Sequence, residues 1–307
     1  MRRFFLKLFL FLAPILLALG LVEYGLSRLT TGYETKRRLL ERHVGDARVL
    51  VTGSSHAYYA VQPRLFGVPA YNTAYVSQDI YYDTRIVLRH LPRARNLRLV
   101  IVSVSYFSFE AVTEDSIEAR RVPFYKRFWG IPPATPGRWA ADYSFIALHG
   151  AERTRRHLWD GFRNSDAEEI DPAGGNAVLP RSNPNAVRNG AVTVARHHDS
   201  MKVGNLGKTV RWMEEMLDAS RARGVPVVLV STPVAPSYRE RLDPAAYQRM
   251  QDAVGGLCRK YGLEYRNYMA DSRFALEDFA DSDHLAARGA EKFSLILRDE
   301  VVSRYVR

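Results

Sequence analysis

One short stretch constrains this chain more than any other: an apolar run that ends in a glycine and two serines. It reads Arg48-Val49-Leu50-Val51-Thr52-Gly53-Ser54-Ser55-His56. The mostly β-branched part predicts a strand buried on both faces, and the glycine and serines predict a tight turn into a helix. A serine in such a turn can act as a nucleophile, because the helix N-terminus supplies N–H donors for a developing oxyanion. Since Gly-Ser-Ser is also common in loops, this hypothesis needs a base from elsewhere in the chain.

A second pair of residues, near the C-terminus, can supply that base. Asp281 and His284 stand just before a helical pattern, at a spacing that lets the carboxylate reach the imidazole and fix its tautomer and orientation. Asp283 is adjacent to the histidine, and the side chain of a direct neighbour usually points away. We therefore expect Asp281, rather than Asp283, to be the partner of His284.

With both motifs in this order, the chain resembles the SGNH (GDSL-like) hydrolase superfamily. In that superfamily the nucleophile follows the first strand and an Asp-x-x-His motif precedes the last helix. The resemblance covers roughly residues 48–109 and 205–307. It is closest in character to membrane-anchored, cell-envelope members, including the family of the D-alanyl-lipoteichoic acid biosynthesis protein. The resemblance implies that Ser55 is the nucleophile, His284 the general base and Asp281 its partner.

The oxyanion-binding residues depart from the family pattern. Gly53-Ser54-Ser55 replaces the usual Gly-Asp-Ser, as in the envelope members. The family takes further donors from a glycine after the second strand and an asparagine after the third, and neither stands at those places here. The backbone N–H of Ser55 is available whatever its neighbours are, and Asn72, Gln78 or Ser105 can add a side-chain donor. The sequence does not choose among these three.

The N-terminus carries an apolar segment, Phe4–Val22, interrupted only by Lys7. A helix of that length spans about 30 Å, the thickness of the hydrocarbon layer of a membrane. Arg2 and Arg3 precede it, so the positive-inside rule places the N-terminus in the cytoplasm and the rest of the chain outside, in the periplasm or extracellular space. The expected location is a single pass through the inner (plasma) membrane.

A cleaved signal peptide is the alternative interpretation of this segment. Ala18-Leu19-Gly20 is acceptable as a small-residue cleavage site. We favour a retained anchor, because the apolar pattern continues past that site through Leu21 and Val22.

The remaining pattern predicts one large α/β domain. Residues 1–29 form the anchor, residues 30–46 a polar juxtamembrane connector whose helix can extend from the anchor, and residues 47–307 the domain. Apolar runs predict strands near residues 48–52, 68–72, 97–104, 225–230 and 263–268, and amphipathic helices separate them. The expected fold is a three-layer, flavodoxin-like parallel sheet of the SGNH-hydrolase type. Ligands of such sheets bind at the carboxyl ends of the strands, where Ser55 and the loop with His284 would meet.

An insertion at about residues 110–203 interrupts this alternation. It is rich in proline, asparagine and glycine, and we expect short helices, one of them near residues 143–162, that face the substrate. His197-His198-Asp199 within it can bind a metal, but a third ligand at a suitable spacing is not evident. We expect neither a metal nor a cofactor.

The formal net charge of +11 suits an acidic partner or a solvated arginine-rich surface. No nucleic-acid motif accompanies the charge, so anionic lipid or an anionic polysaccharide is the expected acidic partner. The single cysteine, Cys258, excludes an intramolecular disulfide and lies in a helical pattern where packing is expected.

Three functions fit these features. The first is a membrane-anchored esterase or O-acyltransferase that uses an acyl donor and a glycan acceptor of the cell envelope, with envelope-biosynthesis proteins as possible partners. The second is a lipase or thioesterase with a small substrate. The third is a non-catalytic envelope assembly protein with the same fold. The anchor and the positive charge favour the first.

Overall fold

The computed structural model describes residues 1–137, 140–162, 170–176 and 180–306. Its centre is a five-stranded parallel sheet with the strand order β2-β1-β3-β4-β5. The strands are β1 (Val49–Thr52), β2 (Ala70–Asn72), β3 (Leu99–Ser103), β4 (Val227–Ser231) and β5 (Glu264–Asn267). This is the order of flavodoxin-like sheets. The predicted α/β fold class is confirmed.

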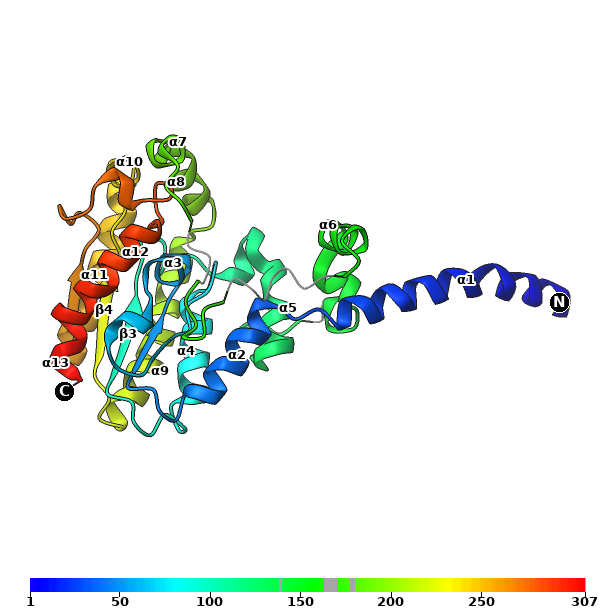
Figure 1. The fold of residues 1–307 in the computed structure, drawn as a ribbon, viewed down its shortest axis with the longest axis horizontal. Helices are drawn as coiled ribbons and strands as arrows, with labels where there is room; N and C mark the ends of the chain where they lie inside the picture. Colours follow the sequence, from blue (N-terminus) through cyan, green and yellow to red (C-terminus); the bar gives the residue numbers. More distant parts are fainter. Residues whose placement is uncertain (138–139, 163–169, 177–179, 307) are drawn as a thin grey trace.

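Helices cover both faces of the sheet, because alternate residues of the central strands point to opposite sides. On one side, Leu50 and Val100 pack with α4 (Ile80–His90), α9 (Leu206–Ala222) and α11 (Pro244–Tyr261). On the other side, Val51 and Ile101 pack with α3 (Ser55–Ala60) and α12 (Ala287–Leu297). The fully buried strands β1 and β3 lie between these two layers (Figure 1).

Polar side chains and a glycine define the ends of two of these helices in different ways. Asp243 caps α11 by accepting the N–H of Ala246 at 2.7 Å, and Gly262 ends that helix with a φ of 69°. Asn205 precedes α9, but its side chain makes no cap. Its amide donates instead to the carbonyl of Glu110, so it fastens the insertion to the start of the helix.

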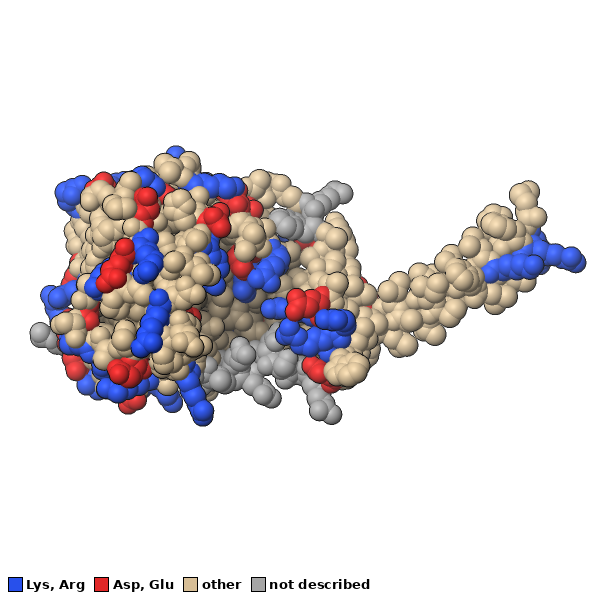
Figure 2. Space-filling model, turned by 90° about the horizontal axis from the view of Figure 1, so that it is seen from above, with Lys and Arg blue, Asp and Glu red and all other residues tan. Residues whose placement is uncertain are grey.

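The N-terminal segment forms a single projecting helix, α1 (Arg2–Ser27), that is long and apolar enough to cross a membrane. The rest of the protein buries none of the most apolar 18 residues of this helix. Figures 1 and 2 show it as a rod that leaves the domain, and Figure 2 shows basic side chains gathered at its far end.

The predicted connector contributes to the packing of the domain. The N-terminal helix does not continue into it: α1 stops at Ser27, and α2 (Gly32–His43) begins after Thr31, whose hydroxyl accepts the N–H of Glu34 at 3.2 Å. Lys36 of α2 is only 1% exposed, and its ammonium group donates to the carbonyls of Asn72, at 2.9 Å, and Gly174. Burial holds the pKa of Lys36 well below its usual value.

The insertion folds into short helices. A helix is present near residues 143–162 as predicted: α6 (Phe145–Trp159), which is broken at Gly150 with a φ of 73°. Residues 138–139, 163–169 and 177–179 of the insertion lie outside the described residues. The other helices of the insertion are η2 (Thr113–Asp115), η3 (Ile117–Arg121), α5 (Val122–Phe124), η4 (Tyr125–Trp129), η5 (Ala140–Asp142), α7 (Pro184–Arg188), α8 (Gly190–Asp199) and, at its end, η6 (Val203–Asn205).

Short helices also occur outside the insertion. They are η1 (Pro63–Phe66), α10 (Pro236–Arg239), η7 (Leu276–Asp278), η8 (Arg298–Val302) and α13 (Ser303–Tyr305).

Candidate active site

The turn after β1 places Ser55 at the carboxyl edge of the sheet. Gly53 has a φ of 141°, and a Cβ atom there would lie 2.8 Å from the Cβ of Ser103 on the neighbouring strand. Only glycine fits both constraints. Ser54 then caps α3, with its hydroxyl 3.4 Å from the N–H of His56. Ser55 is therefore the first residue of a helix that starts directly at the end of a strand.

The structure brings Ser55, His284 and Asp281 together from opposite ends of the chain. The hydroxyl of Ser55 lies 2.9 Å from Nε2 of His284, and Nδ1 of His284 lies 3.0 Å from Oδ2 of Asp281. The Asp281 carboxylate also accepts the backbone N–H groups of Asp283 and His284, at 3.0 and 2.8 Å. These bonds fix the carboxylate, which in turn orients the imidazole toward the serine.

Asp283 does not point away from His284, contrary to our expectation for a direct neighbour. Its Oδ1 atom lies 3.6 Å from Nδ1 of His284 and accepts no hydrogen bond from the described residues. The Asp283 side chain is 1% exposed, whereas that of Asp281 is 38% exposed. The better shielded negative charge beside His284 is therefore that of Asp283.

Two further histidines hold the other oxygen of Asp283. Its Oδ2 atom lies 3.2 Å from Nε2 of His56 and 3.5 Å from Nε2 of His197. Nδ1 of His56 lies 3.0 Å from Ser105 Oγ, and Nδ1 of His197 lies 2.8 Å from the hydroxyl of Tyr238. Sequence reasoning missed this network. The position of His56 directly after Ser55 was the available signal, but nothing in the sequence indicates contact with Asp283.

Burial and charge act in opposite directions on the histidines. Burial lowers the pKa of His197 to about 3, although the charge of Asp283 opposes this shift. Burial also disfavours the charged form of His284, but the charge of Asp283 and the hydrogen bond that His284 donates to Asp281 outweigh it, so the pKa of His284 is raised. Burial disfavours the carboxylate of Asp283 too, yet the three histidines hold its pKa well below its ordinary value. The site therefore favours the protonated form of His284 and the neutral form of His197.

The stretch His197-His198-Asp199, weighed as a metal site and not expected to be one, does not bring its three side chains together. His197 lies in the network, whereas His198 and Asp199 are exposed on α8. His56, Asp283 and His284 do place ligand atoms within 4.8 Å of one another. Both ring nitrogens of each of these histidines already have a protein partner, so hydrogen bonds account for the cluster without a metal ion.

The three predicted side-chain donors for an oxyanion are engaged elsewhere. Both hydrogens of the Asn72 amide go to the carbonyls of Ala57 and Val61, at 2.9 and 3.0 Å. The Gln78 amide donates to Asp83 at 2.7 Å, and the Ser105 hydroxyl contacts His56. Of these three residues, only Gln78 lines the cavity beside Ser55.

Backbone groups are better placed to bind an oxyanion. Ser55 is the first residue of α3, and its N–H donates no hydrogen bond within the described part of the chain.

Ser77, which lines the same cavity, has a backbone in the left-handed region, with a φ of 58°. Thr113 of the insertion holds this loop by donating its hydroxyl to the Ser77 carbonyl at 3.0 Å. Strain of this kind in a non-glycine residue concentrates at functional sites.

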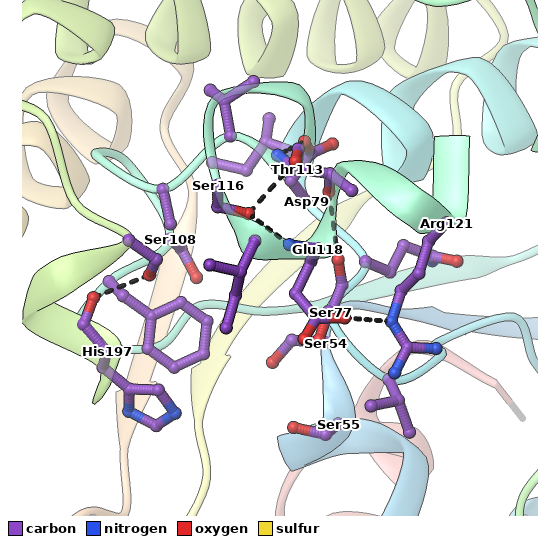
Figure 3. A pocket seen from close by; sticks show the side chains of 18 of the residues that line it. Ser54, Ser55, Ser77, Asp79, Ser108, Thr113, Ser116, Glu118, Arg121 and His197 are labelled. Carbon is purple, nitrogen blue, oxygen red and sulfur yellow. Dashed lines mark hydrogen bonds and ion pairs between the residues drawn. The ribbon is translucent and has the colours of Figure 1, made fainter. Parts of the chain in front are cut away.

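The cavity beside Ser55 has a volume of about 350 Å³, within the range of small-molecule sites. In Figure 3, Ser55, Arg121 and His197 reach it from three elements, α3, η3 and α8. Arg121 is paired with Glu118, but Arg196, which also lines the cavity, has no carboxylate within 4.0 Å among the described residues. The predicted insertion therefore forms one wall of the cavity and supplies an unpaired cation to it.

No protein-family model and no curated protein matches this chain by sequence. Similar solved structures include a protein from Bacteroides fragilis described provisionally as an acylhydrolase, at 8% identity and a TM-score of 0.42, over 88% of this chain and 97% of that one. Another, from Streptococcus pneumoniae, is described provisionally as a platelet activating factor and shows 14% identity and a TM-score of 0.41, over 92% of this chain and 98% of that one. The functional assignment therefore rests on the geometry of the site.

Proposed function

We propose that this chain is a membrane-anchored serine esterase or O-acyltransferase of the SGNH type. The observation that supports the proposal most is the bonded series from Ser55 through His284 to Asp281, with distances of 2.9 and 3.0 Å. A serine, an imidazole and a carboxylate in this series form the arrangement that activates a hydroxyl for acyl transfer.

The reaction proceeds in two steps. The Ser55 oxygen attacks the acyl carbonyl while its proton passes to Nε2 of His284, and the N–H of Ser55 donates to the oxyanion. The tetrahedral intermediate then expels the first alcohol, which takes the proton from His284, and an acyl-serine remains. An acceptor alcohol or water next gives its proton to His284 and attacks the acyl group to form a second tetrahedral intermediate. When the bond to Ser55 breaks, His284 returns this proton to the Ser55 oxygen and the free hydroxyl is restored.

A cell-envelope polysaccharide is the proposed acceptor. The apolar helix α1 would keep the site at a membrane surface, and Arg196 would give the cavity a positive charge that suits an acidic sugar. Turnover of an activated acyl ester, and transfer of its acyl group to an added acidic oligosaccharide, test the two parts of this assignment separately.

We expect Arg196→Ala to raise KM for an acidic oligosaccharide by about 10-fold, because a charge-assisted hydrogen bond is lost. Turnover of a neutral ester should change little. The wild type should also lose affinity for the oligosaccharide as salt rises from about 0.1 to 0.5 M, and the variant should be less sensitive to salt. Arg223→Ala, on the exposed end of α9, is the matched control. Equal KM values for both variants, or affinity independent of salt, would count against an anionic acceptor.

The proposed topology makes a separate prediction. A reporter fused after the C-terminus should be active only outside the cytoplasm, and the protein should stay with membranes after a carbonate wash. The reason is the basic flank that precedes the apolar segment. Activity of a cytoplasmic reporter, or release by carbonate, would overturn the proposed location.

A further inference from the structure

The α6 segment is fastened to the domain-side end of α1 at two points. Glu23, the first acidic residue after the apolar span, accepts the N–H groups of Phe145 and Ile146, at 2.7 and 3.3 Å, and the hydroxyl of Ser144. At the other end of the segment, the ring of Phe162 packs against Gly25 so closely that a Cβ atom there would lie 2.7 Å from it. The segment is therefore held at the level where the apolar part of α1 ends, and Figure 1 shows α6 beside the domain-side end of α1.

This segment exposes large apolar side chains. Trp159 is 91% exposed, Tyr143 is 77% exposed and Leu158 is 50% exposed. Thr154 and His157 of the same helix are buried, so the helix packs against the rest of the chain and still exposes these side chains. Tryptophan and tyrosine concentrate where a membrane meets water, because each ring has an apolar body and a polar group.

Basic residues accompany these rings. Arg155 and Arg156 lie on exposed turns of α6, and Arg156 is paired loosely with Glu152 at 3.4 Å. Arg155 has no carboxylate within 4.0 Å in the described part of the chain. A helix that presents aromatic and leucine side chains together with arginines matches the boundary between acyl chains and anionic headgroups.

We propose that α6 is a membrane-interface helix that lies on the anionic lipid surface around the end of α1. This inference depends on the proposed insertion of α1 but not on any catalytic activity. Glu23 lies directly after the apolar span, and this position favours lipid over a partner protein as the surface that α6 contacts. While α6 remains bonded to the last turns of α1, it cannot leave the bilayer surface. The contact would hold the cavity at a fixed height and orientation above the membrane.

Depth-dependent quenching tests the proposal on the full chain. In a Cys258→Ser background, one cysteine is introduced at Leu158, labelled with an environment-sensitive dye, and reconstituted at low protein density into phosphatidylcholine vesicles with and without phosphatidylglycerol. We expect blue-shifted emission that is quenched by nitroxides at headgroup depth. The shift should be larger with phosphatidylglycerol. Arg155→Glu should reduce the shift, whereas Arg223→Glu should not.

Two reference positions separate the possible failures. A label at Leu17, within the apolar span, should be quenched by nitroxides deep in the acyl chains, and a label at Val192 on α8 should be quenched by neither kind. If the Leu17 label is quenched but the Leu158 label is as exposed to water as the Val192 label, the anchor is correct and the interface helix is wrong. If the Leu17 label is not quenched either, the proposed anchor fails and the interface helix fails with it.

Discussion

Replacing Ser55 by alanine is expected to abolish acyl-ester turnover, and replacing His284 by alanine is expected to do the same. Each change should lower kcat by about 10⁶-fold, the size seen when a nucleophile or its base is removed from a serine hydrolase. Because the two groups act as one unit, joined at 2.9 Å, the double variant should be scarcely worse than either single variant. Steady-state kinetics with an activated ester measure all three.

Ser54→Ala is the matched control for this prediction. Ser54 caps α3 beside the nucleophile position, so its loss should lower the free energy of unfolding by about 1 kcal/mol. Turnover should remain. Wild-type activity in Ser55→Ala, or loss of activity only in Ser54→Ala, would contradict the assignment of Ser55.

Asp283→Asn should move the acid limb of the pH profile of kcat/KM to lower pH. The charge of Asp283 raises the pKa of His284, and the base works only when it is neutral, so the wild-type limb should lie above the ordinary histidine value of about 6.5. Removing the charge lowers that pKa and also destabilises the imidazolium formed during acyl transfer. We therefore expect kcat to fall by about 10- to 100-fold on the high-pH plateau.

The amide of this variant can be accommodated without rearrangement. Its oxygen can take the place of Oδ2, which contacts His56 and His197, and its NH₂ group can take the place of Oδ1, which accepts no hydrogen bond among the described residues. Asp281→Asn should cost more, about 10²- to 10⁴-fold, because it disturbs the tautomer and orientation of His284. Asp299→Asn, which removes an exposed charge paired with Arg298, is the control. An unchanged acid limb in Asp283→Asn would show that the buried charge does not act on His284.

Periodicity and turn chemistry were enough to predict the sheet. Apolar runs such as Leu99–Ser103, bounded by turn signals, mark strands buried on both faces, and Asp243 with Gly262 marks the two ends of α11. The order of Ser55 and the Asp281/His284 pair indicated the site, because both motifs stand at places where a parallel sheet brings loops together. These features are local, so a single sequence carries them.

The rest of the site depends on contacts between distant segments. In the sequence Lys36 looks like a solvated residue of a connector. It is buried nonetheless, because carbonyls of β2 and of the insertion accept hydrogen bonds from its ammonium group. The sequence suggests that Asn72, Gln78 and Ser105 are free donors, yet each is hydrogen-bonded to a residue of α3 or α4. Asp283 meets His56 across 227 positions of the chain. Sequence patterns indicate which residues can bond, but not which partner is within reach.

Labelling with a serine-reactive fluorophosphonate tests the central claim, that Ser55 is an activated nucleophile, most directly. The folded protein should gain one adduct, which peptide mass spectrometry should place on Ser55. The labelling rate should rise with pH as His284 loses its proton, and both Ser55→Ala and His284→Ala should block it. If folded wild-type protein stays unlabelled, or the adduct lies on another serine, the hydrolase assignment is wrong and a non-catalytic assembly role takes its place.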